Sequence, residues 1–301
     1  MSKNILITGG LGHIGSKLIK ELPLDYNLTV VDNLLTQRFC SLFDVGRPIK
    51  FIDKCISDLT IKDLEPMDVV IHLAAITDAA GSFENIKQTE NINLTLTSVF
   101  IDLCDKANCK FIFPSSTSVY GAAVDVVYED NDDFLNPQSP YATTKIWVEK
   151  KLKKYKNDYL VLRFGTIFGL SSGMRFHTAI NRFCYDASLG NPLKIWEENY
   201  NQYRPYLGLN DAIGSIIFFL NNSHWNATYN ILSGNYMLSN IVESIRSLVN
   251  VKVSMVTTPL LNQFSYEVSD NKIKSLGWVP KDNLVLEITN TLNQFKNLQN
   301  E

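Results

Sequence analysis

The chain has few cysteines, no long apolar run and little net charge, and each of these shortages excludes a class of protein. Its five cysteines are odd in number and lack Cys-x-x-Cys spacing, which argues against a disulfide framework and against a zinc or other metal site. The longest apolar candidate, Ile213 to Leu220, is far shorter than the roughly 20 residues of a membrane span. A net charge of −3 provides no bulk attraction to nucleic acid. We therefore expect a soluble protein that binds neither membranes nor nucleic acid.

The N-terminus also lacks a signal-peptide pattern, because Asn4 opens directly into an apolar segment. Together with the scattered cysteines, this absence predicts a cytoplasmic location. The 301 residues, of which 45% are hydrophobic and 20% charged, are typical of a globular protein with one large or two smaller domains.

The first half of the chain alternates short apolar runs with helical patterns. The apolar runs lack strict polar–apolar alternation, as expected of strands buried on both faces of a parallel sheet. The predicted strands are Ile5–Thr8, Leu28–Asp32, Lys50–Ile52, Val69–Ala74, Lys110–Pro114 and Tyr159–Phe164. The predicted helices are Ile14–Glu21, Asn93–Ala107 and Tyr141–Lys154. This order predicts an α/β fold with a doubly wound parallel sheet, whose ligands bind beyond the carboxyl ends of the strands.

A glycine-rich loop joins the first predicted strand to the first predicted helix. Gly9, Gly12 and Gly15 have the spacing Gly-x-x-Gly-x-x-Gly, which permits a tight turn and a close approach of the backbone. The pyrophosphate of a dinucleotide could then bind at the helix N-terminus. We expect His13 and Ile14 to contact the cofactor as part of this loop, and His13 to be a packing residue rather than a catalytic one.

Acidic residues follow the next two predicted strands. Asp32 ends the second strand, where a carboxylate accepts hydrogen bonds from the adenosine ribose and repels a 2′-phosphate. This position favours NAD over NADP in a Rossmann-type domain. Asn33 is expected beside the same ribose, and Asp58 could meet the adenine amino group. The alternatives are a helix or turn cap for Asp32 and a solvated loop residue for Asp58.

The pattern changes after Gly169, where a Ser-Ser-Gly loop precedes further helices and short strands. Helices are predicted over Thr178–Leu189, Asp211–Asn221, Ser239–Val249 and Leu284–Leu298, and strands over Lys194–Trp196, Thr228–Ile231 and Lys252–Val256. We expect residues 1–168 to form the NAD-binding Rossmann domain. Residues 169–301 are expected to form a smaller C-terminal lobe that binds substrate, with segments of the two interleaved.

Tyr141 and Lys145 lie four positions apart and share one face of a predicted helix. A cation beside a phenol favours the phenolate, so this pair could take a proton from a sugar hydroxyl while hydride leaves the carbon. Ser116 ends a neighbouring predicted strand and can face the same ligand. A Tyr–Lys pair at this spacing is common by chance. It indicates an oxidation site only together with the glycine loop and Asp32.

Several ordered motifs resemble the extended short-chain dehydrogenase/reductase family, and within it the nucleotide-sugar epimerases and dehydratases. The matching segments are His72-Leu73-Ala74-Ala75, Asn93 with Thr97, Ser115-Ser116-x-x-Val119-Tyr120-Gly121, Asn136-Pro137-x-Ser139-Pro140-Tyr141, Arg204-Pro205-Tyr206 with Asp211, and Asp270, Lys272 and Leu276-Gly277-Trp278-x-Pro280. The resemblance implies an NAD-dependent enzyme, similar to UDP-glucose 4-epimerases, that acts on a nucleotide-diphosphate sugar.

The resemblance also implies roles for single residues. Tyr141 would be the catalytic base, Lys145 would hold the nicotinamide ribose and lower the pKa of Tyr141, and Ser116 would bond the hydroxyl that is oxidised. The other implied cofactor contacts are Leu59, Leu73, Ala74, Ala75, Asn93, Ser115 and Phe164. The implied substrate contacts are Ser116, Thr117, Tyr141, Thr166, Arg175, Asn181 and Arg204. Arg204 would bind the diphosphate, with a surface salt bridge as the alternative.

The residues after Ser116 distinguish among the reactions of such enzymes. The 4,6-dehydratases usually carry an Asp-Glu pair there and the decarboxylases a glutamate, whereas this chain has Thr117 and Ser118. A reductase would use NADPH, which Asp32 disfavours. What remains is a 4-epimerase, in which a 4-keto sugar turns in the pocket and is reduced on its other face. A 4-oxidase or dehydrogenase that releases the keto sugar, and a non-catalytic NAD-sensing protein, stay open as alternatives.

The resemblance further implies a homodimer formed through the predicted helices Asn93–Ala107 and Tyr141–Lys154. The apolar residues of these helices are equally consistent with ordinary core packing. Neither the nucleotide nor the sugar of the substrate is predicted.

Overall fold

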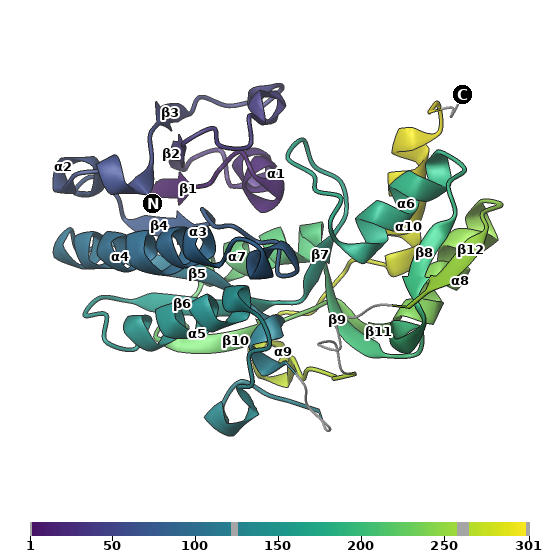
Figure 1. Ribbon diagram of the computed structural model, residues 1–301. Helices are drawn as coiled ribbons and strands as arrows, with labels where there is room; N and C mark the ends of the chain where they lie inside the picture. The colour runs from purple at the N-terminus through teal and green to yellow at the C-terminus, as the bar shows by residue number, and fades with distance from the viewer. Residues whose placement is uncertain (1, 122–125, 258–264, 299–301) are drawn as a thin grey trace.

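The centre of the protein, a computed structural model that describes residues 2–121, 126–257 and 265–298, is a seven-stranded parallel sheet. Its strands are β1 (Asn4–Thr8), β2 (Asn27–Asp32), β3 (Lys50–Asp53), β4 (Val69–His72), β5 (Lys110–Ser116), β6 (Tyr159–Phe164) and β10 (Ala227–Ile231). They lie in the order β10-β6-β5-β4-β1-β2-β3 (Figure 1). The chain therefore begins mid-sheet, runs out to β3 and returns to β4 beside β1. This topology confirms the predicted doubly wound α/β fold.

Helices cover both faces of the sheet, which explains why its strands are apolar throughout. These helices are α1 (His13–Glu21), α2 (Ile61–Leu64), α4 (Thr97–Lys106), α5 (Pro140–Leu152), α7 (Leu209–Asn221) and α9 (Asn271–Ser275). Ile5 and Ile7 of β1 pack with α1, α7 and α9 in one apolar core. Leu6, between them, points to the other face and packs with α2, α4 and α5 in a second core. None of the described helices is long and apolar enough to cross a membrane.

A smaller lobe lies to the right of the main sheet in Figure 1. Its helices are α6 (Ala179–Ser188), α8 (Leu238–Leu248) and α10 (Leu284–Phe295), and its strands β8 (Leu193–Trp196) and β12 (Val253–Val256) pair in parallel. A three-stranded sheet completes the strands: β7 (Thr166–Phe168), β9 (Tyr203–Gly208) and β11 (Gly234–Met237). The lobe has an apolar core of its own, built from α6, α8 and α10 around β8.

The chain does not stay within one lobe after residue 169. Helix α7 packs against α1, and β10 pairs with β6 at the edge of the main sheet. Three strands were not expected from the sequence, namely β7, β9 and β11. The predicted helix Asn93–Ala107 also differs, because the segment Asn91–Leu96 is a π-helical turn that leads into α4. The short helix α3 (Ile86–Glu90) precedes that turn.

A buried ion pair fastens helix α5 to the sheet. Glu149 on α5 accepts three hydrogen bonds from the guanidinium of Arg163 on β6, at 2.6 to 3.2 Å. Arg163 also donates to the hydroxyl of Tyr120 at 2.9 Å, and Ser115 on β5 donates to Glu149. The two charged side chains are only 2% and 5% exposed. The pair therefore fixes α5 relative to the carboxyl ends of β5 and β6.

We predict that Glu149→Gln lowers the free energy of unfolding by about 3–5 kcal/mol, because the guanidinium of Arg163 stays buried without its counter-charge. Denaturant unfolding measures this change. The exposed pair of Lys153 and Asp132 is the control, and Asp132→Asn should cost less than about 1 kcal/mol. Equal, small losses in both variants would contradict the structural role given to Glu149.

Candidate active site

The glycine loop turns so sharply after β1 that its first glycine cannot be replaced. Gly9 has a φ of +66°, and a Cβ there would stand 2.6 Å from the Cα of Ala74. Its N–H donates to the carbonyl of Val31 at 2.8 Å, which ties the loop to the end of β2. The loop therefore lies flat on the carboxyl edge of the sheet, where β1, β2 and β4 end.

The N-terminus of α1, which follows the glycine loop, has features of an anion-binding site. Gly12 precedes the helix and carries no capping side chain, so no side chain covers the N–H groups of the first turn. Gly15 packs against Gly10, and a Cβ on Gly15 would stand 2.5 Å from the carbonyl oxygen of Gly10. These close backbone contacts leave the positive end of α1 open to a phosphate.

Asp32 lies at the end of β2 with its carboxylate oriented by the backbone. It accepts hydrogen bonds from the N–H of Leu11 at 3.1 Å and from that of Leu34 at 2.9 Å. The turn-cap alternative for Asp32 is thus partly realised, while the carboxylate still stands beside the glycine loop. Asn33 and Asp58 are exposed nearby. The side chain of Leu59 lies in the apolar core, so only its backbone could reach a ligand.

Ser116, Tyr141 and Lys145 come together where β5 ends and α5 begins. Ser116 lies close enough to the phenol of Tyr141 to lower its pKa, and its oxygen accepts from the N–H of Ser118 at 3.2 Å. The ammonium of Lys145 lies 5.6 Å from the centre of the Tyr141 ring. It donates to the carbonyl of Pro114 at 2.8 Å. Tyr141 and Lys145 are buried, at most 9% exposed, and Ser116 beside them is half-buried.

The electrostatics of this group differ from the sequence-based expectation that Lys145 lowers the pKa of Tyr141. Burial raises the pKa of Tyr141 to about 12, although the hydrogen bond to Ser116 and the charge of Arg175 oppose it. Burial also lowers the pKa of Lys145 to about 7, against the attraction of Glu149. The protein alone therefore favours the neutral phenol, and the phenolate needs further positive charge in the site.

Polar side chains fix the segment that follows β4. His72 contacts the hydroxyl of Thr8 through Nδ1 at 2.7 Å and that of Thr97 through Nε2 at 3.0 Å. The amide of Asn93, in the π-helical turn, both accepts from and donates to the backbone of Ile76 at 2.8 Å. Leu73, Ala74 and Ala75 are thereby held beside the glycine loop. The amide of Asn93 is used in these two backbone hydrogen bonds. We therefore expect it to hold the segment after β4 rather than to contact the cofactor directly.

The side chains of several other predicted site residues form hydrogen bonds or pack within the protein itself. Ser115 donates to Glu149, and Thr117 donates to the carbonyl of Phe164 at 3.3 Å. The side chain of Phe164 belongs to the main apolar core. Asn181 is fully buried and bonds the N–H of Gly169 and the carbonyl of Arg175. We therefore expect these side chains to position the site rather than touch a ligand.

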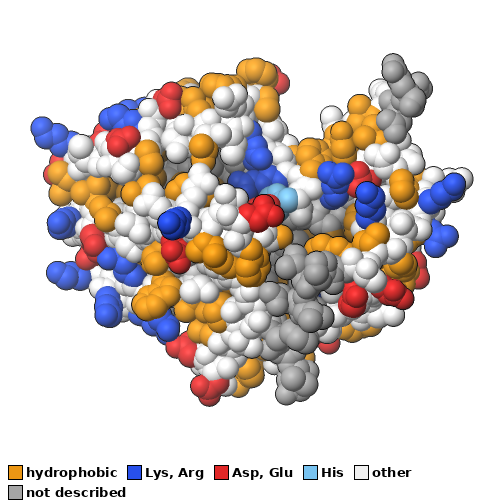
Figure 2. All heavy atoms as spheres, viewed as in Figure 1, with side chains coloured by type: hydrophobic (Ala, Val, Ile, Leu, Met, Phe, Trp, Pro, Cys, Tyr) orange, Lys and Arg blue, Asp and Glu red, His pale blue; other side chains and the backbone are white. Residues whose placement is uncertain are grey.

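The remaining predicted substrate residues lie in the part of the chain after β6. Thr166 begins β7, and Arg204 on β9 donates to Gln202 at 3.2 Å and stacks over the ring of Tyr266. Figure 2 shows basic side chains at the base of a hollow between the two parts of the molecule.

The sequence reasoning missed four charged or titratable residues of the site. Arg38, Asp78 and His177 all act electrostatically on Arg175 or on one another, yet they come from separate loops without a motif. Glu149 was missed although it follows Lys145 by one helical turn, a spacing that could have found it.

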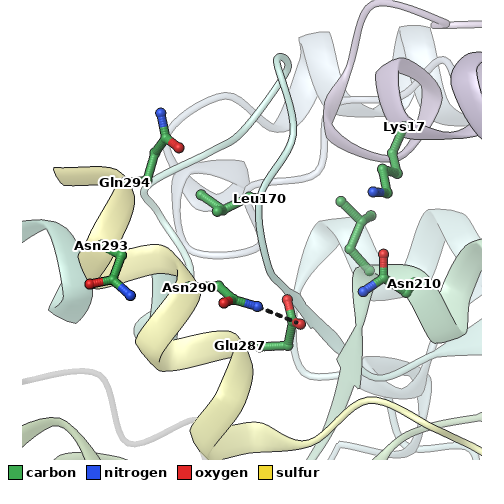
Figure 3. Close-up of a pocket in the computed structure, with 8 residues that line it drawn as sticks. Lys17, Leu170, Asn210, Glu287, Asn290, Asn293 and Gln294 are labelled. Carbon is green, nitrogen blue, oxygen red and sulfur yellow. Dashed lines mark hydrogen bonds between the residues drawn. The ribbon is translucent and has the colours of Figure 1, made fainter. Parts of the chain in front are cut away.

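A second hollow, of about 400 Å³, lies between α1, α7 and α10 (Figure 3). Lys17, Asn210 and Glu287 line it, and Asn290 donates to Glu287 at 3.3 Å. None of the predicted site residues lines this hollow. It is therefore separate from the edge of the sheet that carries the catalytic group.

Residues 5–231 match the sequence profile of the NAD dependent epimerase/dehydratase family. The chain belongs to this family. It is 26% identical to a Methanocaldococcus jannaschii protein assigned provisionally as a UDP-glucose 4-epimerase, over 97% of this chain and 98% of that one. It is also 26% identical to the dTDP-D-glucose 4,6-dehydratase of Mus musculus, over 93% and 85% of the two chains.

Solved structures share the fold. The UDP-N-acetylglucosamine 4-epimerase of Methanobrevibacter ruminantium, in complex with UDP-N-acetylmuramic acid, superposes with a TM-score of 0.86 at 24% identity and covers 98% of each chain. Family membership makes this chain an NAD-dependent enzyme of the epimerase/dehydratase type.

The residues present fit NAD. The glycine loop offers a cradle that any Cβ at Gly9 would fill, and α1 presents uncapped N–H groups to a pyrophosphate. The carboxylate of Asp32 stands where it could accept hydrogen bonds from the hydroxyls of a ribose. Gly9 and Gly12 would hold the pyrophosphate and Asp32 the adenosine ribose, and Tyr141 and Lys145 would meet the nicotinamide half.

The pH dependence of stability tests whether His13, in the glycine loop, is buried as a neutral ring. Its Nε2 donates to the carbonyl of Gly169 at 2.9 Å, and burial lowers its pKa to about 4, against the effect of that carbonyl. Above pH 6.5 the ring is neutral in both the folded and the unfolded protein. As the pH falls from 6.5 toward 4, the unfolded chain takes up the proton first, so stability is lost over this window.

We predict that His13→Gln, whose amide can still donate to Gly169, removes this loss. Wild-type protein should lose about 3 kcal/mol more than the variant between pH 7 and pH 4, measured by denaturant unfolding at each pH. Parallel stability curves for the two proteins would show that His13 is not buried as a neutral ring.

Proposed function

We propose that this enzyme is an NAD-dependent 4-epimerase of a nucleotide-diphosphate sugar. The observation that carries the proposal is the group of Ser116, Tyr141 and Lys145, at the same edge of the sheet as a glycine loop suited to NAD. In this proposal residues 1–168, predicted as the Rossmann domain, bind NAD. The lobe predicted as residues 169–301 binds the nucleotide sugar, with Arg204 on its diphosphate.

The chemistry follows from the positions of three side chains. Tyr141 takes the proton from the sugar hydroxyl, while Ser116 holds that hydroxyl by a hydrogen bond. NAD, when bound, would supply the acceptor and then the donor of the hydride exchanged with the sugar carbon. Lys145, which already contacts the backbone at Pro114, keeps positive charge near the phenolate. The same tyrosine gives the proton back when the keto sugar is reduced.

Elimination of water is less well supported, although some relatives are named as 4,6-dehydratases. That reaction needs an acid and a base close to the carbon next to the oxidised one. Directly after Ser116, position 117 is a threonine whose hydroxyl donates to a backbone carbonyl, and position 118 is a serine. Neither side chain ionises near neutral pH. Release of the keto sugar by a 4-oxidase uses the same residues and is the remaining alternative.

We also propose that the enzyme is a homodimer through α4 and α5. Val99 on α4 is 62% exposed and Trp147 on α5 is 56% exposed, which is unusual for large apolar side chains on packed helices. Ile86 on α3 is exposed beside them, and the groove between α3 and α5 is lined by Trp147 and Pro140. Burial of this face against a second copy would remove it from water.

Incubation of the purified protein with a panel of UDP, dTDP, GDP and CDP sugars, without added cofactor, tests the proposed reaction. NMR of the products should show a C4 epimer of one sugar, and absorbance of reduced nicotinamide should not accumulate. A keto sugar with lasting nicotinamide absorbance would support the oxidase instead. A 4-keto-6-deoxy sugar would establish a dehydratase and overturn the proposal.

We predict that Tyr141→Phe lowers turnover by at least about 100-fold, because the phenol oxygen is the group that carries the proton. The bound nucleotide, measured by chromatography after denaturation, should stay at the wild-type amount. Tyr155→Phe, which removes another buried hydroxyl bonded to the carbonyl of Cys109, is the control and should retain turnover. Near-normal turnover in Tyr141→Phe would contradict its role as the base.

A further inference from the structure

The segment of residues 169–175, here called the strap, lies directly on the glycine loop. A Cβ on Gly173 would stand 2.4 Å from the carbonyl oxygen of Gly12, so the two backbones are in contact. The N–H of Gly173 donates to the hydroxyl of Ser16 on α1 at 3.0 Å. The hydroxyl of Ser171 donates to the carbonyl of His13 at 2.9 Å. The strap thus packs against the glycine loop and the first turn of α1.

Both ends of the strap are fixed by one side chain. The amide of Asn181 on α6 accepts from the N–H of Gly169 at 3.2 Å and donates to the carbonyl of Arg175 at 3.1 Å. Arg38, from the loop after β2, donates to the carbonyl of Gly173 at 2.8 Å. These bonds determine where the side chain of Arg175 begins and direct it toward the glycine loop.

The guanidinium of Arg175 lies beside Gly12, and its hydrogen-bonding capacity is not fully used within the described part of the chain. One of its terminal nitrogens is 3.9 Å from where a Cβ on Gly12 would stand. Its Nε is buried without a hydrogen bond, and Arg175 forms no ion pair with any residue that the structure describes.

The charges around Arg175 leave it uncompensated. Burial lowers its pKa and the neighbouring Arg38 lowers it further, whereas Tyr141, Asp78 and Asp32 oppose this. Two guanidinium groups thus approach one another at the positive end of a helix. Such an arrangement is unfavourable unless an anion binds between them.

We propose that Arg175 binds the pyrophosphate of NAD together with the N-terminus of α1, and that the strap carries it there. The resemblance implies a substrate contact for Arg175, but its guanidinium lies beside Gly12 of the glycine loop, although its charge also acts on Tyr141. The diphosphate of the sugar nucleotide is left to Arg204 on β9. The inference rests on the NAD dependence of the family and not on the proposed epimerase reaction.

Equilibrium binding to four probes tests this assignment. NAD and ADP-ribose carry the pyrophosphate, adenosine lacks it, and UDP represents the substrate's diphosphate. Each is titrated calorimetrically into wild-type protein, Arg175→Gln and Arg175→Met, with bound nucleotide checked by chromatography. Where NAD stays bound through purification, its release rate after dilution gives the same comparison. Arg182→Gln is the matched control, because Arg182 on α6 is 54% exposed and pairs with Asp186.

Loss of Arg175 should weaken the binding of NAD and of ADP-ribose by at least about tenfold in Kd, since hydrogen bonds to a charged partner are lost. Adenosine and UDP should bind as in the wild type, and Arg182→Gln should change none of the four. Weaker UDP with unchanged ADP-ribose would return Arg175 to the substrate and overturn the proposal. Equal weakening of ADP-ribose and adenosine would also overturn it, by showing that the strap only supports the fold. The second variant keeps the test valid if the first fails to fold, as judged by its melting temperature.

Discussion

The buried ion pair between Glu149 and Arg163 determines where the catalytic group lies. It joins α5, which carries Tyr141 and Lys145, to the strand that ends beside Ser116. Replacement by apolar residues could give similar stability, because desolvation of two charges offsets much of their attraction. The pair instead specifies geometry. Three hydrogen bonds between the guanidinium and the carboxylate permit only one position of α5 on the sheet.

Burial has a second consequence for the chemistry of the site. The same exclusion of water that strengthens the ion pair raises the pKa of Tyr141 and lowers that of Lys145. A base that is neutral in the protein alone becomes useful only when positive charge enters beside it, as an oxidised nicotinamide would provide. The strap contributes to this balance, because Arg175 favours the phenolate and lies next to the glycine loop.

Much of the fold was readable from the sequence because its signals are local. The strands of the main sheet are continuous apolar runs, and Gly9 and Gly12 fall between the first strand and helix as the turn requires. Strands such as β9 and β11 were not readable, because they depend on pairing with each other across the lobe. The strap was missed for the same reason: its contacts join residues more than 100 positions apart, such as Gly173 and Ser16, and no local pattern encodes them. The assignments of catalytic residues remain predictions.

The return of hydride to the carbon that lost it is the central claim, and deuterium labelling tests it most directly. The nucleotide sugar that the protein converts is prepared with deuterium at C4 and incubated with the enzyme in ordinary water. NMR of the product should show the C4 epimer with deuterium still at C4. Deuterium missing from C4 would contradict the account.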